Sequence, residues 1–251
     1  MSTVWAMDEA ARGGGRLVYL GVEHSRDPSA SQFQEIKTAF DEARPTVVFY
    51  EGPDRGIGAD GPDSITTRGE SGYVRWLAST TGATTRPLEP SPIALFEDLA
   101  EDYPADQVEL FFVLREATRL RDREKLEGQA LDEAVATLLG RLRTMSVDIN
   151  LPFSDLTGLE AAYAEYWTRP ADWRAVPANW FDPVADDAET GGRFMAALNA
   201  ASSERRNVHM YRVLAEAALS GEQVFAIVGR NHVPMQEDAL RCALGQQRPA
   251  F

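Results

Sequence analysis

Two apolar runs near opposite ends of the chain are followed by the same short pattern. Leu17 to Leu20 precedes Gly21-Val22-Glu23-His24, and Val224 to Val228 precedes Gly229-Arg230-Asn231-His232. An uninterrupted apolar run of four or five residues is typical of a buried strand. A glycine after the run allows a turn or the close approach of another backbone. We therefore predict two strands that each carry a histidine at the C-terminal end, where open α/β sheets bind ligands.

Strand and helix patterns alternate in the first third of the chain. A polar, Gly-rich turn between two short apolar runs predicts a hairpin, and a helical spacing of apolar residues follows it. A helix between two buried strands predicts a right-handed crossover. The expected elements are strands over 3–7, 17–20 and 46–50, a helix over 32–42, a loop over 54–69, a helix over 70–82 and an edge strand over 84–90.

The middle of the chain has a different pattern. From 91 to about 140 the apolar spacing is helical, which is typical of core-packing helices. Residues 143–192 show no clear period and are rich in aromatic residues and proline, so they are either a cap over the site or a small separate core. Helices over 194–219 and 233–244 then flank the second apolar run.

These patterns predict an α/β fold with a mixed central sheet flanked by helices. The repeated motif indicates two related strand-turn halves with a helical insertion between them. We expect one composite domain over 1–251, within which 92–192 is a mostly helical insertion or cap. A chain of 251 residues is long enough to bury a substantial core.

Composition limits the classes of partner. The formal net charge of −14 opposes binding to nucleic acid or to an anionic membrane surface, because both need an excess of basic residues. A single cysteine excludes an intrachain disulfide and a multi-cysteine zinc site. No leader-like segment or long apolar run is present, so we expect a cytoplasmic protein. We therefore expect the partner to be a small-molecule or peptide substrate. Composition does not predict the oligomeric state.

Three residues form the candidate catalytic group. Two of the three histidines, His24 and His232, end the repeated motifs, and Glu51 ends the strand over 46–50. If these strands lie side by side, the three side chains converge. Two imidazoles and a carboxylate suit a divalent metal of the Mn, Co or Zn class with open positions for water. The same atoms also suit metal-free general base catalysis by His24, in which Glu51 or another carboxylate fixes the tautomer and His232 stabilises or protonates the leaving group.

Four further polar residues are candidates for substrate binding. Arg206 and Asn207 lie on the helix before the second motif, where an arginine can hold a carboxylate or an oxyanion. Asn207 would orient a ligand or cap the helix. Glu70 and Glu89 are additional carboxylates near predicted element ends. We also expect a helix to begin just after each motif histidine, which would favour its neutral form.

The order of these motifs resembles the TraB/GumN and Tiki group, which is related to erythromycin esterase in the EreA/ChaN-like superfamily. The resemblance covers about 1–90 and 195–245 and is carried by Gly21–His24, Val47–Glu51, Arg206–Met210 and Gly229–His232. It implies a mixed α/β core with functional positions at His24, Glu51, Arg206, Asn207 and His232. It also implies metal-dependent proteolysis, as in Tiki-like members, or metal-independent lactone hydrolysis, as in esterase-like members. The chain departs from the family pattern at Glu23, usually a small residue, and at Asn207, often an aspartate.

Two functions follow as hypotheses, beside a third reading in which a regulatory or interaction protein keeps the fold without the chemistry. The first is a hydrolase of peptide or ester bonds, for which the side chains of His24 and His232 should lie within about 8 Å of each other, with Glu51 beside them. The second is a non-catalytic protein that binds haem, iron or a small molecule. Its sign would be a deep apolar pocket lined by the aromatic residues of 163–181, with no carboxylate–histidine contact.

Overall fold

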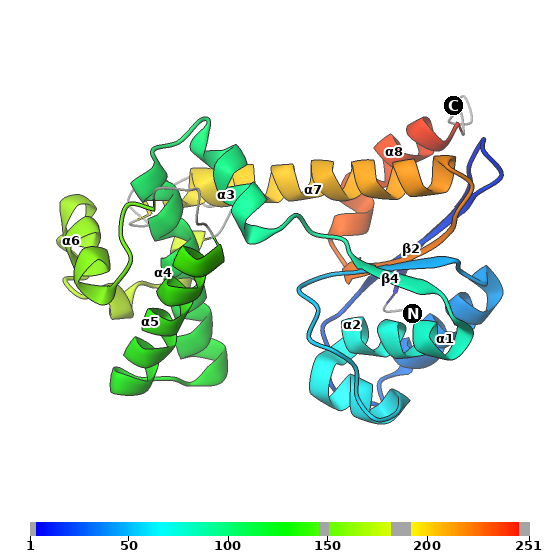
Figure 1. The fold of residues 1–251 in the computed structure, drawn as a ribbon, viewed down its shortest axis with the longest axis horizontal. Coiled ribbons are helices and arrows are strands. Elements are labelled where there is room, and N and C mark those ends of the chain that lie inside the picture. The colour runs from blue at the N-terminus through cyan, green and yellow to red at the C-terminus, as the bar shows by residue number, and fades with distance from the viewer. Residues whose placement is uncertain (1–3, 146–150, 182–191, 246–251) are drawn as a thin grey trace. The chain divides into compact units, whose positions relative to one another are not determined.

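The computed structural model describes residues 4–145, 151–181 and 192–245, and the chain divides into two compact units. Met1–Pro90 and Arg206–Phe251 form one, which we call the sheet unit; Ser91–Arg205 form the other, the helical unit. The sheet unit holds a five-stranded mixed sheet flanked by helices, so the predicted α/β class is confirmed (Figure 1). The helical unit begins next to the start expected for the insertion and continues beyond 192 to Arg205.

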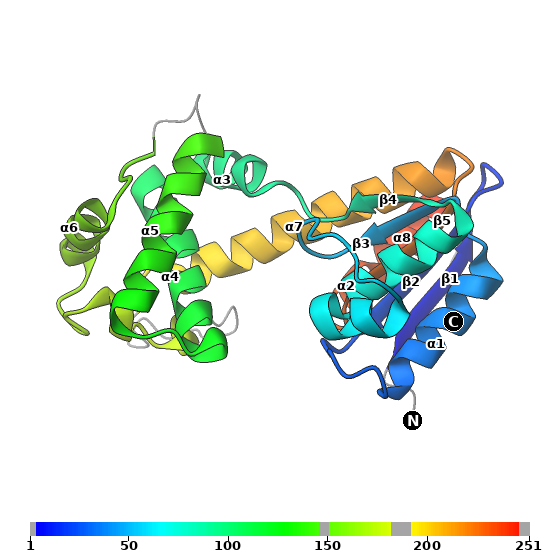
Figure 2. The same ribbon diagram turned by 60° about the horizontal axis from the view of Figure 1, so that its bottom comes forward.

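The sheet places the two repeated motifs on neighbouring strands (Figure 2). Strand β2 (Arg16–Val22) pairs antiparallel with β1 (Trp5–Ala10) and in parallel with β5 (Gln223–Gly229). Strand β5 also pairs in parallel with β3 (Val47–Tyr50). Gly229 lies opposite Val22, so the two motifs are one residue out of register. In spatial order the strands are β1 (Trp5–Ala10), β2 (Arg16–Val22), β5 (Gln223–Gly229), β3 (Val47–Tyr50) and the edge strand β4 (Thr84–Pro87).

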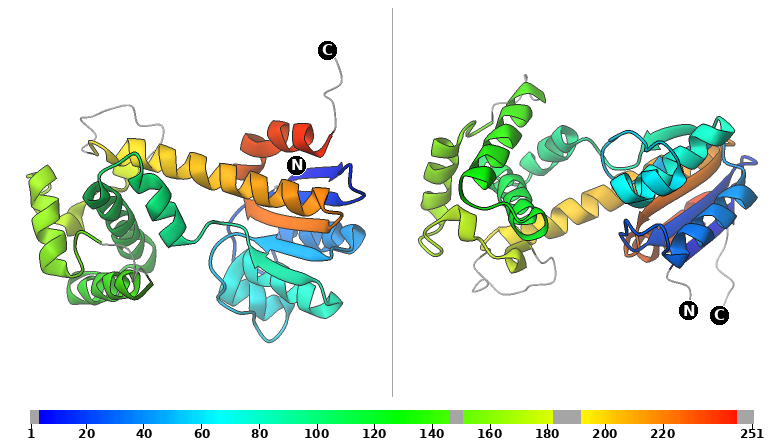
Figure 3. Two further views of the ribbon diagram at one scale, coloured as in Figure 1. Left: turned by 45° about the horizontal axis from the view of Figure 1, so that its top comes forward. Right: turned by 90° about the horizontal axis from the view of Figure 1, so that it is seen from below.

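Each face of the sheet has its own core. Because side chains alternate along a strand, Val18 and Leu20 pack toward helices α1 (Ser31–Ala43) and α2 (Gly61–Thr81), within one cluster of buried side chains. Leu17 and Tyr19 belong to a second cluster that includes α8 (His232–Leu244) and the C-terminal part of α7 (Met195–Leu219). Figure 3 shows these helices on either side of the strands. Both faces are therefore covered, as the uninterrupted apolar runs predict.

The predicted loop over 54–69 is wrong in its second half, because α2 begins at Gly61. The Asp60 side chain caps this helix by accepting a hydrogen bond from the Asp63 N–H at 2.8 Å, and Pro62 occupies the first turn. The helix breaks at Gly69, whose φ of 65° and ψ of −154° suit glycine alone. The helix predicted from Glu70 onward is the segment after this break.

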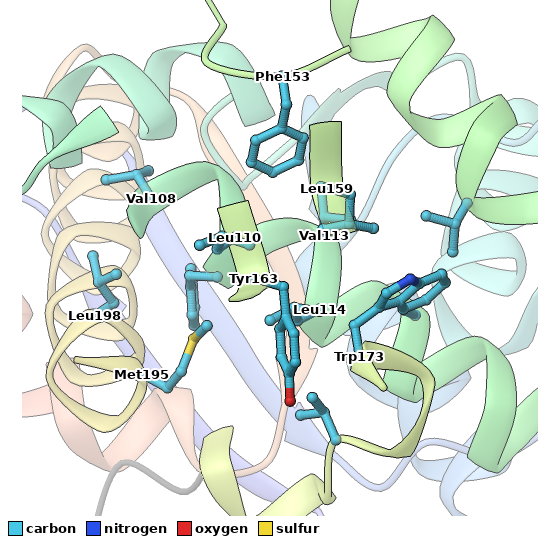
Figure 4. Packing of buried hydrophobic residues seen from close by; sticks show 14 of the residues in the cluster. Val108, Leu110, Val113, Leu114, Phe153, Leu159, Tyr163, Trp173, Met195 and Leu198 are labelled. Atoms are coloured by element: carbon cyan, nitrogen blue, oxygen red, sulfur yellow. The ribbon is translucent and has the colours of Figure 1, made fainter. Parts of the chain in front are cut away.

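The helical unit has a separate core (Figure 4). Tyr163, Trp167, Trp173 and Trp180 are buried in it, so the aromatic residues expected to form a cap or a small core pack inside their own unit. Helix α6 was not predicted, because aromatic residues and proline obscure its period. The expected irregular stretch over 143–192 includes 146–150 and 182–191, which lie outside the described residues. The elements are α3 (Pro92–Ala100), α4 (Ala105–Glu124), α5 (Gly128–Met145), α6 (Leu156–Tyr166), two short turns of 3₁₀ helix (Trp173–Ala175 and Ala178–Phe181) and the start of α7.

Within the described ranges, no helix is both long enough and apolar enough to cross a membrane.

Candidate functional site

The glycine of each repeated motif makes room for the other motif. A Cβ atom on Gly21 would lie 2.8 Å from the carbonyl oxygen of Arg230 and 3.0 Å from its Cα. A Cβ atom on Gly229 would lie 3.3 Å from Glu51 Oε2 and 3.4 Å from His24 Nε2. The two motifs are also joined directly, because the Arg230 N–H donates to the Val22 carbonyl at 2.9 Å. Close packing of the two loops therefore explains why glycine occurs at both positions.

The ends of β2, β3 and β5 surround a cavity of about 440 Å³. His24, Glu51 and His232 all line it, so the structure brings together the three residues proposed as the catalytic group. Glu51 Oε1 lies 4.0 Å from His232 Nε2. The remaining lining residues are Val22, Glu23, Gly229, Arg230 and Asn231.

Glu70, rather than Glu51, is the carboxylate that orients His24. Glu70 Oε1 accepts a hydrogen bond from His24 Nδ1, and Glu70 Oε2 accepts one from the Ser25 N–H at 3.3 Å. A carboxylate only accepts, so the hydrogen of the neutral imidazole lies on Nδ1 and Nε2 keeps its lone pair. The His24 side chain is 65% exposed, whereas that of Glu70 is 8% exposed. The pair thus presents an accessible basic nitrogen on a buried support.

The break in α2 is what places Glu70 beside His24. Gly69 lies directly before Glu70 and packs against the chain that follows His24, since a Cβ on Gly69 would be 3.2 Å from the Ser25 carbonyl oxygen. The next residue, Ser71, donates its hydroxyl to the Glu51 carbonyl at 2.8 Å. Two consecutive residues of α2 therefore hold two of the loops that form the site.

His232 has a similar arrangement with an amide partner. Its Nδ1 lies 2.8 Å from Asn207 Oδ1, which also accepts from Gln236 Nε2 at 2.8 Å. The hydrogen of the neutral ring is therefore on Nδ1, and Nε2 faces Glu51. Burial lowers the pKa of the His232 imidazole, although the charge of Glu51 opposes the shift. The charge of Arg206 acts in the same direction as burial, as does a proton on His24 when that ring is charged, and both favour a neutral His232 ring.

Glu51 is held by a network of charged groups. Its Oε2 accepts the Gly229 N–H at 2.5 Å, and its Oε1 lies 3.5 Å from a guanidinium nitrogen of Arg206. The same Arg206 nitrogen pairs with Glu89 Oε1, and Glu89 Oε2 accepts the Gly52 N–H at 2.9 Å. These contacts fix the carboxylate of Glu51 relative to the ends of β3 and β5.

The four residues predicted to bind substrate all come to the site, but each contacts another site residue. Glu70 holds His24, Asn207 holds His232, and Arg206 and Glu89 support Glu51. None of them is among the described residues that line the cavity. The geometry supports a positioning role for all four, and direct contact with substrate stays a prediction.

Two buried glutamines at the site were not predicted. Gln32 forms two hydrogen bonds with the backbone of Glu23, which fixes the turn that carries His24. Gln236 holds Asn207 in the orientation that receives the His232 hydrogen. The role of Gln236 could have been predicted from its position in the sequence, because it shares the buried face of α8 with Val233 and Leu240. A polar side chain on an otherwise apolar helix face needs a buried partner.

The expectation that a helix begins just after each motif histidine was wrong for His24. Helix α8 begins at His232 itself, but α1 begins only at Ser31, seven residues after His24. The partial positive charge of a helix N-terminus therefore acts on His232 and not on His24, because it decays within the first turn.

A divalent metal would need three ligands close together. His24 Nε2, His232 Nε2 and Glu51 Oε1 are suitable donor types and face one cavity. As they stand, however, no three histidine, cysteine, aspartate or glutamate side chains in the described ranges are grouped closely enough to hold an ion. We therefore derive no chemical step through a metal.

Comparison with known proteins found no matching family model, no matching curated protein and no matching solved structure.

Proposed function

We propose that this protein is a hydrolase of peptide or ester bonds, lactones included, with His24 as the general base. The contact that carries this proposal is the hydrogen bond between buried Glu70 and exposed His24, which directs a basic Nε2 toward the cavity. A carboxylate that orients an imidazole and stabilises its protonated form is the arrangement that general base catalysis requires.

In the proposed reaction, His24 Nε2 takes a proton from water while the water oxygen bonds to the carbonyl carbon of the substrate. The charge that develops on the imidazole is balanced by Glu70. The bond from carbon to the leaving nitrogen or oxygen then breaks, and that atom takes the proton back from Nε2. Arg230 and Asn231 line the same cavity and are placed to donate hydrogen bonds to the carbonyl oxygen as it becomes negative.

His232 and Glu51 form the other side of the proposed site. With its hydrogen on Nδ1, neutral His232 presents an acceptor nitrogen, so it does not protonate a leaving group in that state. The observed orientation suits a second base, or a ligand if substrate binding draws the three acceptors onto a cation. This leaves both the metal-free and the metal-assisted version of the hydrolase for experiment.

A non-catalytic binding protein has less support in this fold. The sign of that function would be a pocket lined by the 163–181 aromatic residues with no carboxylate–histidine contact. Tyr163, Trp167, Trp173 and Trp180 pack in the core of the helical unit, and Phe181 is the one described aromatic residue of that segment that lines a cavity there. His24 contacts Glu70 directly. Membership of the TraB/GumN–Tiki group, related to erythromycin esterase, belongs to the same proposal and is supported by the α/β fold and by the convergence of His24, Glu51 and His232.

The test is hydrolysis of nitrophenyl esters, lactones and fluorogenic peptides by the purified chain, with and without a chelator. We expect His24→Ala to lower the rate by roughly 10²- to 10⁴-fold. His209→Ala is the matched control, because His209 lies on α7 and does not line the cavity. Activity retained in chelator selects the metal-free version, and activity restored by Mn, Co or Zn selects the metal-assisted one. No turnover in any condition, or equal rates for wild type and His24→Ala, overturns the proposal.

A further inference from the structure

The helical unit contains a second, larger cavity of about 600 Å³, a volume typical of small-molecule sites. It lies among residues of Ser91–Arg205 and is independent of the proposed hydrolase site. Most of its wall is apolar, and the side chains that provide this surface include Ile93, Phe96, Phe112, Leu138 and Phe181.

A single buried carboxylate interrupts this apolar wall. Glu109 on α4 is 1% exposed and lines the cavity. Its Oε2 accepts the Phe153 N–H at 3.1 Å, but its Oε1 has no hydrogen-bond partner among the described residues. A buried oxygen without a hydrogen-bond partner destabilises the fold, so such a group in a cavity wall is explained by a partner supplied from outside the chain.

The rest of the polar lining has four arginines and two carboxylates, Glu116 and Asp122, which pair with Arg119 and Arg121. Arg119 is paired with Glu116 and Glu124. Arg123 and Arg141 are exposed residues of α4 and α5 that also line the cavity, and neither forms a salt bridge within the described part of the chain. Guanidinium groups of this kind attract a carboxylate, sulfonate or phosphate.

We propose that this cavity binds a small amphipathic anion whose apolar body carries an N–H or O–H group that donates to Glu109 Oε1. The apolar wall accommodates the body of the ligand, Glu109 receives the donor, and Arg123 and Arg141 pair with the anionic group. Each part of the ligand thus corresponds to one chemical feature of the cavity.

Two probes of the same shape separate the parts of this proposal. Indole-3-acetate has an aromatic body, an N–H donor and a carboxylate, whereas benzothiophene-3-acetate replaces the N–H with sulfur. Titration calorimetry on the full-length chain at pH 8, where Glu109 is ionised and accepts, should show one saturable site, with indole-3-acetate bound about 10-fold more tightly because it alone donates to Glu109. Absence of saturable binding for both probes, or equal affinity for the two, overturns the proposal.

Substitutions then locate the two polar contacts. Glu109→Met should abolish the preference for the N–H probe while benzothiophene-3-acetate still binds, which also shows that the cavity is intact. Glu109→Gln keeps an acceptor oxygen and should keep part of the preference. Combined Arg123→Gln and Arg141→Gln should weaken both probes by about 10-fold, whereas Arg143→Gln, an exposed change elsewhere on α5, should change neither. A preference that persists in Glu109→Met places the probe elsewhere and contradicts the assignment.

Discussion

His24 and Glu70 divide between them two requirements of the proposed catalytic base. The imidazole is exposed enough to meet a substrate, while its carboxylate partner is buried and held by the Ser25 N–H as well. Because a buried carboxylate has few alternative partners, the hydrogen stays on Nδ1 of His24. The hydrogen bond to Glu70 therefore fixes the tautomer of His24, which the nearness of a carboxylate alone would not do.

Replacement of Glu70 by glutamine tests this role. An amide can present its NH₂ to Nδ1 and favour the opposite tautomer, so we expect the hydrolysis rate to fall by about 10²- to 10⁴-fold. The nitrogen-15 chemical shifts of the His24 imidazole should report the change of tautomer directly. Glu42→Gln, an exposed change on α1, is the control. A lower rate with an unchanged His24 tautomer would contradict the mechanism.

Glu109 makes stability depend on pH in a direction opposite to that of most acids. Burial raises the pKa of Glu109 to about 7, from a usual value of 4.5. The folded state therefore binds more protons than the unfolded state between these values, and the free energy of unfolding falls as pH rises through that window. At about 1.4 kcal/mol per pKa unit, the loss across the whole window is on the order of 3–4 kcal/mol.

The lowered pKa of His232 acts in the opposite sense, because its folded state loses protons first and stability falls as pH decreases. The informative measurement is therefore the difference in unfolding free energy between wild type and Glu109→Gln, from urea titrations at pH 5 and pH 8. We expect the wild type to lose stability relative to Glu109→Gln at pH 8. A difference that does not change with pH would mean that Glu109 is ionised throughout.

At the scale of elements, the parallel neighbours β2 and β5 end in loops that pack against each other. The Gly21 position is the tighter of the two, since an added Cβ would meet the Arg230 backbone at 2.8 Å. Backbone cannot rotate away as a side chain can, so the contact must be relieved by moving a loop.

We predict that Gly21→Ala lowers the free energy of unfolding by about 1–3 kcal/mol, as overpacking does. Gly140→Ala is the matched control, because Gly140 lies in helix α5 with nothing within 4 Å of an added Cβ. That change should stabilise by about 0.5–1 kcal/mol, because alanine favours helix. Thermal unfolding of both variants provides the comparison, and equal melting temperatures would show that the loops of β2 and β5 are not closely packed.

The hydrophobic pattern of the sequence was sufficient to predict the strands and the convergence of the site residues. It was insufficient to predict which side chains form hydrogen bonds with one another there. Two apolar runs followed by Gly-x-x-His predicted the strand-end positions of His24 and His232, and the apolar run over 46–50 predicted that of Glu51. The partner of His24 was not predicted, because Glu70 reaches it only through the break at Gly69. A single positive φ in the middle of a helix leaves no periodic signal.

At the scale of the whole molecule, two units have separate cores and share one helix. Residues up to Arg205 of α7 belong to the helical unit, and residues from Arg206 onward belong to the sheet unit. The two adjacent arginines pair accordingly, Arg205 with Asp98 and Asp102 and Arg206 with Glu51 and Glu89. The sequence predicted one composite domain, since periodicity does not report where one core ends and another begins.

This division predicts that destabilisation stays local. Leu114→Ala in the core of the helical unit should cost about 2–5 kcal/mol and increase amide hydrogen exchange over Ser91–Arg205. Ile227→Ala in β5 should instead increase exchange in the sheet unit. Mass spectrometry of exchanged peptides distinguishes the cases, and a uniform increase across both units in either variant would indicate a single cooperative core.

The mutual packing of the Gly21 and Gly229 loops has a consequence for directed evolution of the site. A library that varies only one loop is screened against an unchanged neighbour whose backbone or side chains fill the available space. Such a library should return glycine more often at position 21, where an added Cβ meets the Arg230 backbone, than at position 229, where it meets the ends of the Glu51 and His24 side chains. New specificities should emerge when 21–24 and 229–232 are diversified together, so that a larger residue in one loop is selected with a compensating change in the other.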